Sequence, residues 1–331
     1  MARSANSFPA QRSGRTAAPT VVVAMGGHAF LKPGERGSYE EHLENSRQVC
    51  RQLMTFVERD YNLVITHGNG PQVGDLLTQV ELARDRVPAL PLEVLVAQTE
   101  GSLGYFLQLG LLNELRARDL RRYVVTVVTQ VVVERDDPAF ARPTKPVGPF
   151  LGEGEARQLA ERLGWQVGED AGRGWRRLVP SPRPLKVIQR GMVDEAARAG
   201  HIVIAGGGGG IPVAKSESND YVGVEAVIDK DLTASVLATD VHADLLVILT
   251  AVDSVALNFG RPDEVRLGAV TLSECARYIE QGHFAAGSMG PKVEAVYQFL
   301  QRGGRRGLIT SPERLAEALD GTAGTHFVGR L

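Results

Sequence analysis

Residues 201–210 read HIVIAGGGGG, a mainly apolar and β-branched run that enters five consecutive glycines. The same unit occurs at 20–27, which read TVVVAMGG, and at 62–70, which read NLVITHGNG. Short apolar runs that end at glycine predict buried strands followed by tight turns. The chain therefore repeats one strand-and-turn unit, and this repetition decides the fold.

Helical patterns alternate with these strands. They lie near 39–59, from Pro71 onward, and at 313–319, and further apolar strands lie at 245–250 and 307–310. Fully apolar strands that alternate with helices are typical of a parallel sheet covered on both faces. We therefore predict an α/β fold in which an open, mostly parallel sheet is sandwiched between helices.

This rhythm breaks between residues 124 and 183, where a Pro- and Gly-rich stretch contains both tryptophans, Trp165 and Trp175. A strand followed by such an excursion predicts a small protruding lid subdomain at roughly 130–180, within a single domain that covers 20–331. Residues 1–19 are rich in Ser and Arg and contain no acid, which predicts a disordered N-terminal extension.

Composition argues against several classes of protein. The formal charge is −2, and the densest basic cluster, at 116–122, resembles a solvated helix end, so no nucleic-acid surface is indicated. No apolar stretch is long enough to span a membrane. Cys50 and Cys275 fall in helical patterns without metal-ligand spacing, which indicates reduced, structural thiols. We therefore expect a cytoplasmic protein that binds neither nucleic acid nor membrane.

The three glycine turns indicate an anionic ligand. Parallel strands place their carboxyl ends at one edge of a sheet, where ligands of such sheets bind. Glycine lets backbone N–H groups approach an oxyanion closely. One such turn would be weak support, because glycine ends many strands for packing reasons, but three at one edge predict phosphate or carboxylate binding. The sequence contains neither a Walker A motif nor a Rossmann fingerprint.

Lysine is scarce and stands in constrained motifs. The chain has 6 lysines against 31 arginines, and three of the lysines occur in PTKPVGPF (Lys145), VIDKD (Lys230) and GSMGPK (Lys292). A compact ammonium group meets an anion as a point charge, which a planar guanidinium does not imitate. A phosphoryl group in transfer needs such a partner. The alternative is a chance placement of three exposed side chains.

The surroundings of two of these lysines favour an anion site. If a helix begins at VIDKD, Asp229 can cap it, and Asp231 either holds lysines in position or is a first-turn acid favoured by the helix dipole. A helix that begins near Pro291 puts Lys292 in its first turn, where the dipole disfavours a cation. An anionic ligand at that helix end would remove the conflict.

Long motifs along the chain are similar, in the same order, to those of one family. They are ITHGNGPQVGDLL, VTQVVVERDDPAFARPTKPVGPF, IAGGGGGIPV, GVEAVIDKDL, GHFAAGSMGPKVEA and GLITS. With them the chain resembles carbamate kinase, of the amino acid kinase fold family, from residue 21 to residue 324. The resemblance implies reversible phosphoryl transfer between ATP and carbamate, giving ADP and carbamoyl phosphate. It also implies a homodimer, a nucleotide-borne Mg²⁺ without a protein metal site, and a net reaction toward ATP in arginine or carbamoyl phosphate catabolism.

The resemblance also assigns site residues. Lys230 and Lys292 match catalytic lysines that contact the nucleotide phosphates, Asp231 matches the aspartate that orders the site, and Lys145 matches the lysine that the lid delivers. The positions that match the substrate turns are Gly26, Gly27, His28, Asn69, Gly70, Gly207, Gly208 and Gly209. Besides Lys230 and Lys292, the positions on the nucleotide side are Thr250, Val252, Asp253, Asn258, Gly287, Ser288 and Met289.

Two departures from the family pattern leave alternatives open. His28 stands where the family usually has asparagine, next to the expected carbamate position, and the nucleotide-side segment carries the small Ala251 and Ala256. His28 is either a tolerated change or the sign of a kinase for another small carboxylate or phosphonate. A further alternative is a nucleotide-binding regulator without catalysis, against which the intact lysines argue. Carbamate is already an anion, so no histidine base is required.

Overall fold

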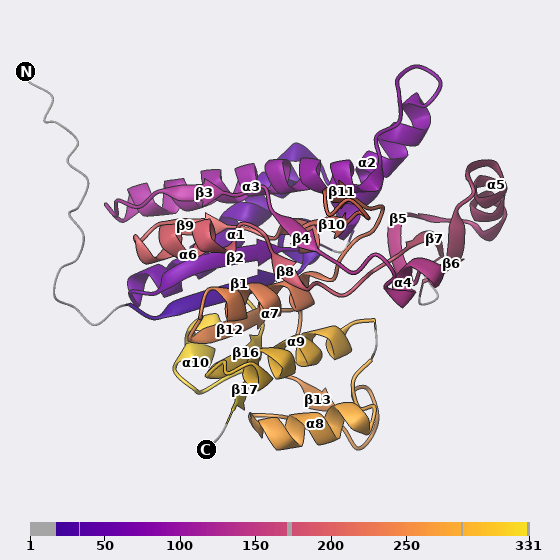
Figure 1. Ribbon diagram of the computed structural model, residues 1–331. Helices are drawn as coiled ribbons and strands as arrows, with labels where there is room; N and C mark the ends of the chain where they lie inside the picture. The colour runs from indigo at the N-terminus through magenta and orange to yellow at the C-terminus, as the bar shows by residue number, and fades with distance from the viewer. Residues whose placement is uncertain (1–17, 33, 171–173, 286, 330–331) are drawn as a thin grey trace, which may run out of the picture.

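The structure, a computed structural model, describes residues 18–32, 34–170, 174–285 and 287–329, so residues 1–17 of the predicted extension lie outside the described residues. Within the described part, eight strands form the largest sheet, in the order β15-β17-β16-β12-β1-β2-β9-β3 (Figure 1). In chain order, the bounds of these strands are β1 Thr20–Met25, β2 Asn62–His67, β3 Val124–Thr126, β9 Ile202–Ile204, β12 Leu245–Leu249, β15 Ala269–Thr271, β16 Arg306–Thr310 and β17 Thr325–Val328.

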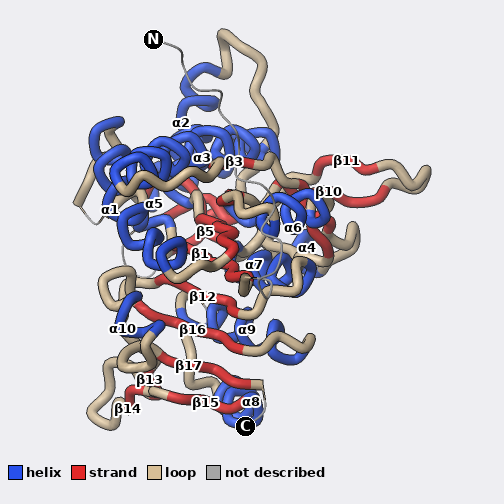
Figure 2. The backbone as a smooth tube through the Cα atoms, turned by 90° about the vertical axis from the view of Figure 1, so that its left-hand side faces the viewer, coloured by secondary structure: helices blue, strands red, loops and turns tan. Residues whose placement is uncertain are grey.

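This sheet is open and mostly parallel. β1 pairs in parallel with β12 and β2, and β9 pairs in parallel with β2 and β3. β16 continues the parallel array beside β12, whereas β17 runs antiparallel to β16. Figure 2 shows β1, β12, β16, β17 and β15 one below the next. The predicted α/β class with a mostly parallel sheet is confirmed.

Helices cover both faces of the sheet, as the predicted sandwich requires. The covering helices are α1 Tyr39–Glu58 and α3 Leu92–Ala117 on one face, and α6 Arg190–Arg198, α7 Lys230–Asp240 and α9 Met289–Gln301 on the other. Val21 and Val23 of β1 pack in the cluster that contains α1 and α3, whereas Val22 and Ala24 pack on the opposite face. This alternation follows from the two-residue period of a strand, and it explains why every residue of β1 is apolar or buried.

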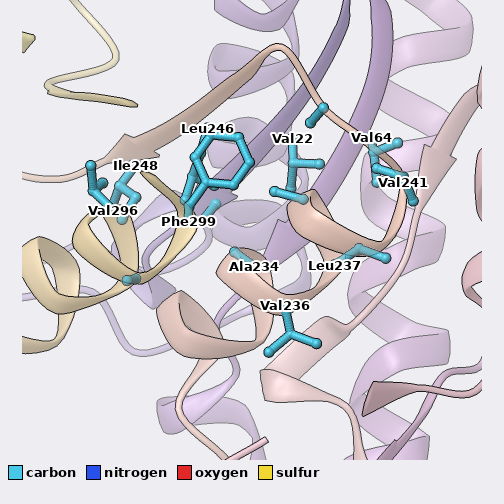
Figure 3. Close-up of a cluster of buried hydrophobic side chains, with 14 of the residues drawn as sticks. Val22, Val64, Ala234, Val236, Leu237, Val241, Leu246, Ile248, Val296 and Phe299 are labelled. Atoms are coloured by element: carbon cyan, nitrogen blue, oxygen red, sulfur yellow. The ribbon is translucent and has the colours of Figure 1, made fainter. Parts of the chain in front are cut away.

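Figure 3 shows the face that α7 and α9 cover. Val22, Val64 and Leu246 come from three neighbouring strands and belong to one buried cluster with Leu237 of α7 and Phe299 of α9. Full burial of each such side chain stabilises the fold by roughly 1.5–3 kcal/mol. The carboxyl ends of β12, β1, β2 and β9 are therefore held side by side by a packed core.

Two helices begin where proline indicated and one begins later than expected. α2 (Gly70–Ala83) begins near Pro71 and α9 begins at Met289, near Pro291, whereas α10 (Leu315–Leu319) begins two residues after the predicted residue 313. Proline is tolerated anywhere in a first helical turn, because the N–H that it lacks would have no partner there. A proline therefore locates the start of a helix to within one turn.

Three smaller sheets lie beside the main one in the described part of the chain. They have the orders β11-β10-β4-β8, β5-β7-β6 and β13-β14. Their strands are β4 Gln130–Val132, β5 Lys145–Leu151, β6 Gln166–Glu169, β7 Trp175–Val179, β8 Lys186–Val187, β10 Ile211–Lys215, β11 Tyr221–Gly223, β13 Ala256–Leu257 and β14 Val265–Arg266. The remaining helices are α4 Pro138–Ala141, α5 Glu153–Leu163 and α8 Leu272–Glu280.

The sheet β5-β7-β6 and helix α5 stand away from the main sheet, at the right of Figure 1. They cover residues 145–179, inside the region 130–180 for which a lid was predicted, whereas β4 pairs with β10 and β8. Among the helix residues of α5, only Ala156 is buried, so this unit has little apolar core of its own.

Stacked arginines hold this unit together instead. The guanidinium groups of Arg157 and Arg177 lie over the rings of Trp175 and Trp165, at 5.0 and 4.9 Å from the ring centroids. Each such contact between a cation and an aromatic ring contributes on the order of 0.5–2 kcal/mol. The two tryptophans that marked this region in the sequence therefore each pack against an arginine of the same unit.

Two glycines let this unit seat closely on the main body. A Cβ built on Gly74 of α2 would lie 2.5 Å from the Cα of Gly148 in β5, where φ is +85°. No larger residue fits at position 74 unless the backbone of β5 moves. This unit therefore meets α2 backbone to backbone, and the contact fixes the position of β5, whose first residue is Lys145.

Both cysteines are structural in their surroundings. Cys50 in α1 and Cys275 in α8 are buried and form no disulfide, as predicted.

Within the described residues, no helix combines the length and apolar character needed to cross a membrane.

Candidate active site

The first two glycine turns meet at the carboxyl ends of β1 and β2. A Cβ built on Gly68 would lie 3.0 Å from the backbone nitrogen of Gly27 and 3.2 Å from Cδ of Lys230. The N–H of Gly68 also donates to the carbonyl of Met25 at 2.9 Å. Glycine at position 68 is therefore what allows the two turns and the stem of Lys230 to converge at one point.

The third turn, residues 206–210, fits between β2 and the segment that leads into α7. A Cβ on Gly208 would lie 2.2 Å from Nδ2 of Asn69, and a Cβ on Gly209 would lie 2.3 Å from the carbonyl oxygen of Ile228. Both glycines also have positive φ, which other residues rarely adopt. The three turns that the sequence predicted at one sheet edge therefore lie in contact with one another.

One carboxylate joins two of the three motif lysines. Nζ of Lys230 donates to both carboxylate oxygens of Asp231 at 2.9 Å, and Nζ of Lys292 donates to Oδ2 of Asp231 at 3.2 Å. Asp231 is 1% exposed, so these bonds are shielded from water. Of the two interpretations of Asp231 that the sequence left open, the contacts support the one in which it holds lysines in position.

The third lysine lies beside the same helix end. Asp229 caps α7 by accepting from the N–H groups of Asp231 and Leu232, as predicted, and its Oδ2 is 3.7 Å from Nζ of Lys145. Nζ of Lys145 also donates to the carbonyl of Ile228 at 2.9 Å. Residues from β5, α7 and α9 thus bring three ammonium groups to the edge where the glycine turns meet.

Burial and charge act in opposite directions on these groups. Burial would raise the pKa of Asp229, but the charges on Lys145 and Lys230 and the helix N–H groups hold this pKa below its usual range. Burial would lower the pKa of Lys230, but the carboxylates of Asp231 and Asp229 outweigh it and raise this pKa. Burial lowers the pKa of Lys145, against the charge on Asp229. Lys230 and Asp229 therefore stay charged as a mutually stabilising set.

The set carries an excess of positive charge. Three ammonium groups face two carboxylates, and the N-termini of α7 and α9 add the positive ends of two helix dipoles. The unfavourable placement of Lys292 in the first turn of α9 is partly relieved by Asp231, which lies within hydrogen-bonding distance of its ammonium group. The remaining charge favours an anionic ligand, because an anion there would complete the neutralisation.

The nucleotide-side positions lie beyond β12 and before α9. The N–H of Thr250 donates to the carbonyl of Thr310, and Asp253 accepts from Ser311 Oγ at 2.6 Å. Asn258 has positive φ, and its side chain bonds Asp263 within the loop and His283 beyond α8. Val252 is half-buried, whereas Gly287 and Ser288 are exposed and Met289 begins α9. Contact of these residues with a nucleotide stays a prediction.

His28 lies in the short helical turn Gly27–Ala29 that follows β1, and its side chain is outside the described part of the structure. Its effect on the substrate therefore stays open.

Two residues behind the glycine turns were not singled out by the sequence analysis. They are Glu100 of α3 and Thr129, which are both buried and hydrogen-bonded to each other. The available signal was the position of Glu100, four residues after Val96 and three before Leu103 on the buried face of α3.

An open parallel sheet with glycine turns and joined lysines at the carboxyl ends of its strands has the features of an enzyme that transfers phosphoryl groups. A sequence model described as the amino acid kinase family matches residues 19–311. The chain belongs to the amino acid kinase family.

Several of the similar proteins are carbamate kinases. The chain is 49% identical to the carbamate kinase of Thermococcus kodakarensis over 311 residues, which cover 93% of this chain and 98% of that protein. It is 44% identical to the carbamate kinase-like protein YahI of Escherichia coli, over 93% of this chain and 98% of that one. A solved structure of carbamate kinase from Giardia lamblia bound to AMP-PNP is similar with a TM-score of 0.88 at 41% identity, over 94% of this chain and 99% of that one.

His67 gives the site a measurable dependence on pH. Burial lowers the pKa of this histidine from 6.5 to about 4. Between these values, the unfolded chain takes up a proton that the folded protein does not, so stability falls as the pH falls from 6.5 toward 4. A pKa shift of this size lowers the free energy of unfolding by at most about 3 kcal/mol over this pH range.

We predict that His67→Gln removes most of this acid-side loss, although its stability at pH 7 is lower than that of the wild type. Urea unfolding of both proteins at several pH values between 7 and 4 measures the effect. An equally steep loss in the variant would show that His67 does not cause it.

Proposed function

We propose that this protein is a carbamate kinase that transfers a phosphoryl group reversibly between ATP and carbamate, giving ADP and carbamoyl phosphate. The observation that carries the proposal is the joining of Lys230 and Lys292 through Asp231 at the edge where three glycine turns meet. The similarity to carbamate kinases over nearly the whole chain supports it. We further propose a cytoplasmic enzyme that runs toward ATP in arginine or carbamoyl phosphate catabolism.

In this mechanism the protein brings two anions together and offsets their repulsion. An oxygen of carbamate attacks the phosphorus of the terminal phosphate of ATP, the bond from that phosphorus to the bridging oxygen breaks, and ADP leaves with the electron pair. No proton has to move, because carbamate already carries a negative charge. Lys230 and Lys292 stabilise the charge that develops on the phosphoryl oxygens, in the manner of other phosphoryl-transfer enzymes.

The turns and the lid orient the reactants. The amide groups of Gly207 and Gly208 face the transferring group, whereas the N–H of Gly209 donates to the carbonyl of Gly206 at 3.1 Å, so Gly209 shapes the turn beside the substrate. Carbamate binds beside the turn Gly26, Gly27 and His28 and beside Asn69 and Gly70. Lys145 closes the site from the lid, because its contact with the carbonyl of Ile228 already places it at the entrance to α7. The adenine and ribose lie along Thr250, Val252, Asp253 and Asn258, and the phosphates approach the start of α9 at Gly287, Ser288 and Met289.

A divalent ion is implied by the use of ATP, and we propose Mg²⁺ carried by the nucleotide. The donor groups fit this arrangement. The Asp231 carboxylate bonds two ammonium groups, and the Asp229 carboxylate caps α7 and faces Lys145, so neither offers several free oxygens to a metal. Mg²⁺ prefers few protein ligands and substrate phosphates in such sites. When bound, it supplies further neutralisation of the phosphate charge.

We also propose that the protein is a homodimer whose copies meet through α3. This helix exposes Val94, Tyr105 and Leu112, which are spaced by whole numbers of turns and therefore lie on one face. Tyr39, at the start of α1, is also exposed, and its ring lies 5.8 Å from that of Phe106 in α3. An apolar stripe on an exposed helix face is typical of a subunit interface.

We predict that Leu112→Glu weakens the dimer, since it would bury a charge in the proposed interface. Light scattering after size-exclusion chromatography should report a monomer at micromolar concentration, against a dimer for the wild type. Leu82→Glu, at an exposed position near the end of α2, is the matched control and should stay dimeric. A monomeric wild type, or an unchanged Leu112 variant, would remove this interface.

We predict that Lys292→Ala lowers turnover a hundredfold or more, because the transferring group loses one of its cations. Lys230→Arg should also be damaging although it keeps the charge, since Cδ of Lys230 lies in the tight space beside Gly68. Formation of ATP from ADP and carbamoyl phosphate measures both effects, and thermal unfolding controls for folding. A loss below tenfold for Lys292→Ala would take this lysine out of the mechanism.

A further inference from the structure

A buried acid lies directly behind the third glycine turn and has no part in the mechanism above. Glu100 of α3 is 1% exposed, and its Oε2 accepts from the backbone N–H of Thr129 at 2.8 Å. Within the described residues, its Oε1 has no hydrogen-bond partner. Burying a carboxyl group with one oxygen left without a hydrogen bond costs free energy, so the presence of Glu100 here calls for an explanation in the fold or the site.

Thr129 links this acid to both ends of the glycine turn. Its Oγ1 accepts from the N–H of Gly206 at 3.0 Å and donates to the carbonyl of Val127 at 2.6 Å. Its own carbonyl accepts from the N–H of Ile211, at the far end of the turn, at 2.8 Å. One residue therefore clamps the first and last points of the loop, and Glu100 fixes the backbone of that residue.

The side chain of Glu100 also forms part of the wall behind the turn. A Cβ built on Gly207 would lie 3.1 Å from Cγ of Glu100 and 2.6 Å from Nε2 of His67. The turn therefore cannot move backward into the body of the protein. The N–H groups of Gly207 and Gly208 have no acceptor within this short helical turn, whereas the N–H of Gly209 donates to the carbonyl of Gly206 at 3.1 Å. The first two N–H groups therefore remain available to a ligand.

Two further threonines complete the support. Oγ1 of Thr66 donates to the carbonyl of Gly206, and Oγ1 of Thr233 donates to the carbonyl of Gly209, both at 2.8 Å. These bonds engage carbonyl groups of the turn, whereas Thr129 accepts from the N–H of Gly206. Thr129 thus holds an N–H group at the start of the turn, and Glu100 holds Thr129 in position through the N–H of Thr129.

We propose that Glu100 is a positioning residue for phosphoryl transfer, which acts through Thr129 to hold the glycine turn with its amide groups toward the substrate. This inference rests on the proposed function for its substrate, carbamoyl phosphate, but the positioning itself is a property of the fold.

The charge of Glu100 fits a geometric role. Burial raises the pKa of this carboxyl well above its usual value, against the N–H group of Thr129, so the uncharged form is favoured. A negative charge directly behind the turn would oppose binding of an anion in front of it. An uncharged oxygen that accepts from Thr129 is sufficient, and glutamine supplies one.

The test compares Glu100→Ala, Glu100→Gln and Thr129→Val by formation of ATP from ADP and carbamoyl phosphate. We expect Glu100→Ala and Thr129→Val to lower kcat/KM for carbamoyl phosphate at least tenfold, with KM for ADP within about twofold of the wild type. Glu100→Gln should stay within about threefold, because it keeps the acceptor oxygen. In the double variant Glu100→Ala/Thr129→Val, the losses should not multiply, since both changes break one link.

Hydrogen exchange at the amides of residues 203–211 in the ligand-free protein gives a reading that needs no activity. We expect faster exchange in Glu100→Ala and Thr129→Val, and wild-type exchange in Glu100→Gln. This pattern in a protein that does not use carbamoyl phosphate would refute the proposed function while supporting the positioning role.

Other outcomes would overturn the role of Glu100. They are unchanged exchange and kcat/KM in Glu100→Ala, equal losses toward ADP and carbamoyl phosphate, or a Glu100→Gln variant as impaired as Glu100→Ala. The first would show that the link carries no constraint. The second would show a general loss of structure, and the third would show that the charge matters and the acceptor geometry does not.

Discussion

The arrangement of the site depends on the hydrogen bonds that the buried carboxylate of Asp231 accepts from two lysines. This carboxylate accepts from Lys230 of its own helix and from Lys292 of α9, and it lies in the first turn of α7, where the helix dipole favours an acid. Removing one partner of a buried ion pair typically costs about 3–5 kcal/mol, because the remaining charge is left without compensation. Here two ammonium groups would be left facing each other. The starts of α7 and α9 are therefore held together by charge as well as by packing.

The glycine turns supply the complementary constraint. Side chains could not be added at positions 208 and 209 without collision with Asn69 or with the carbonyl of Ile228. The strands that lead into the turns are neighbours in the sheet, in the order β1-β2-β9, and their burial on both faces fixes how far each turn projects. The packed core fixes the positions of the strand ends, and the close contacts behind the turns prevent the turns from moving back. The amide groups and the ammonium groups therefore converge at one point.

Much of this could be predicted from local patterns. Apolar strands that end in glycine determined the fold class, and the rarity of lysine singled out Lys145, Lys230 and Lys292, which the structure brings to one edge of the sheet. The capping role of Asp229 also followed from its position before a helix. These features depend on residues close in sequence, for which strand period, helix capping and turn geometry are sufficient.

The remaining features depend on contacts between distant residues. Asp231 and Lys292 are 61 residues apart, and the link from Glu100 through Thr129 to Gly206 spans separations of 29 and 77 residues. Nothing local marks Thr129 as the clamp of a turn so far along the chain. The contact between α2 and β5 also joins residues that are distant in sequence, because Gly74 and Gly148 are adjacent only once α2 and β5 have packed.

The most direct test is a crystal structure with ADP and a planar phosphoryl mimic such as aluminium fluoride. We expect the mimic to lie between the ammonium groups of Lys230 and Lys292, within hydrogen-bonding distance of both and of the amide groups of Gly207 and Gly208. A mimic that binds away from either lysine, or with the glycine turn facing elsewhere, would contradict the idea that one buried carboxylate organises the site.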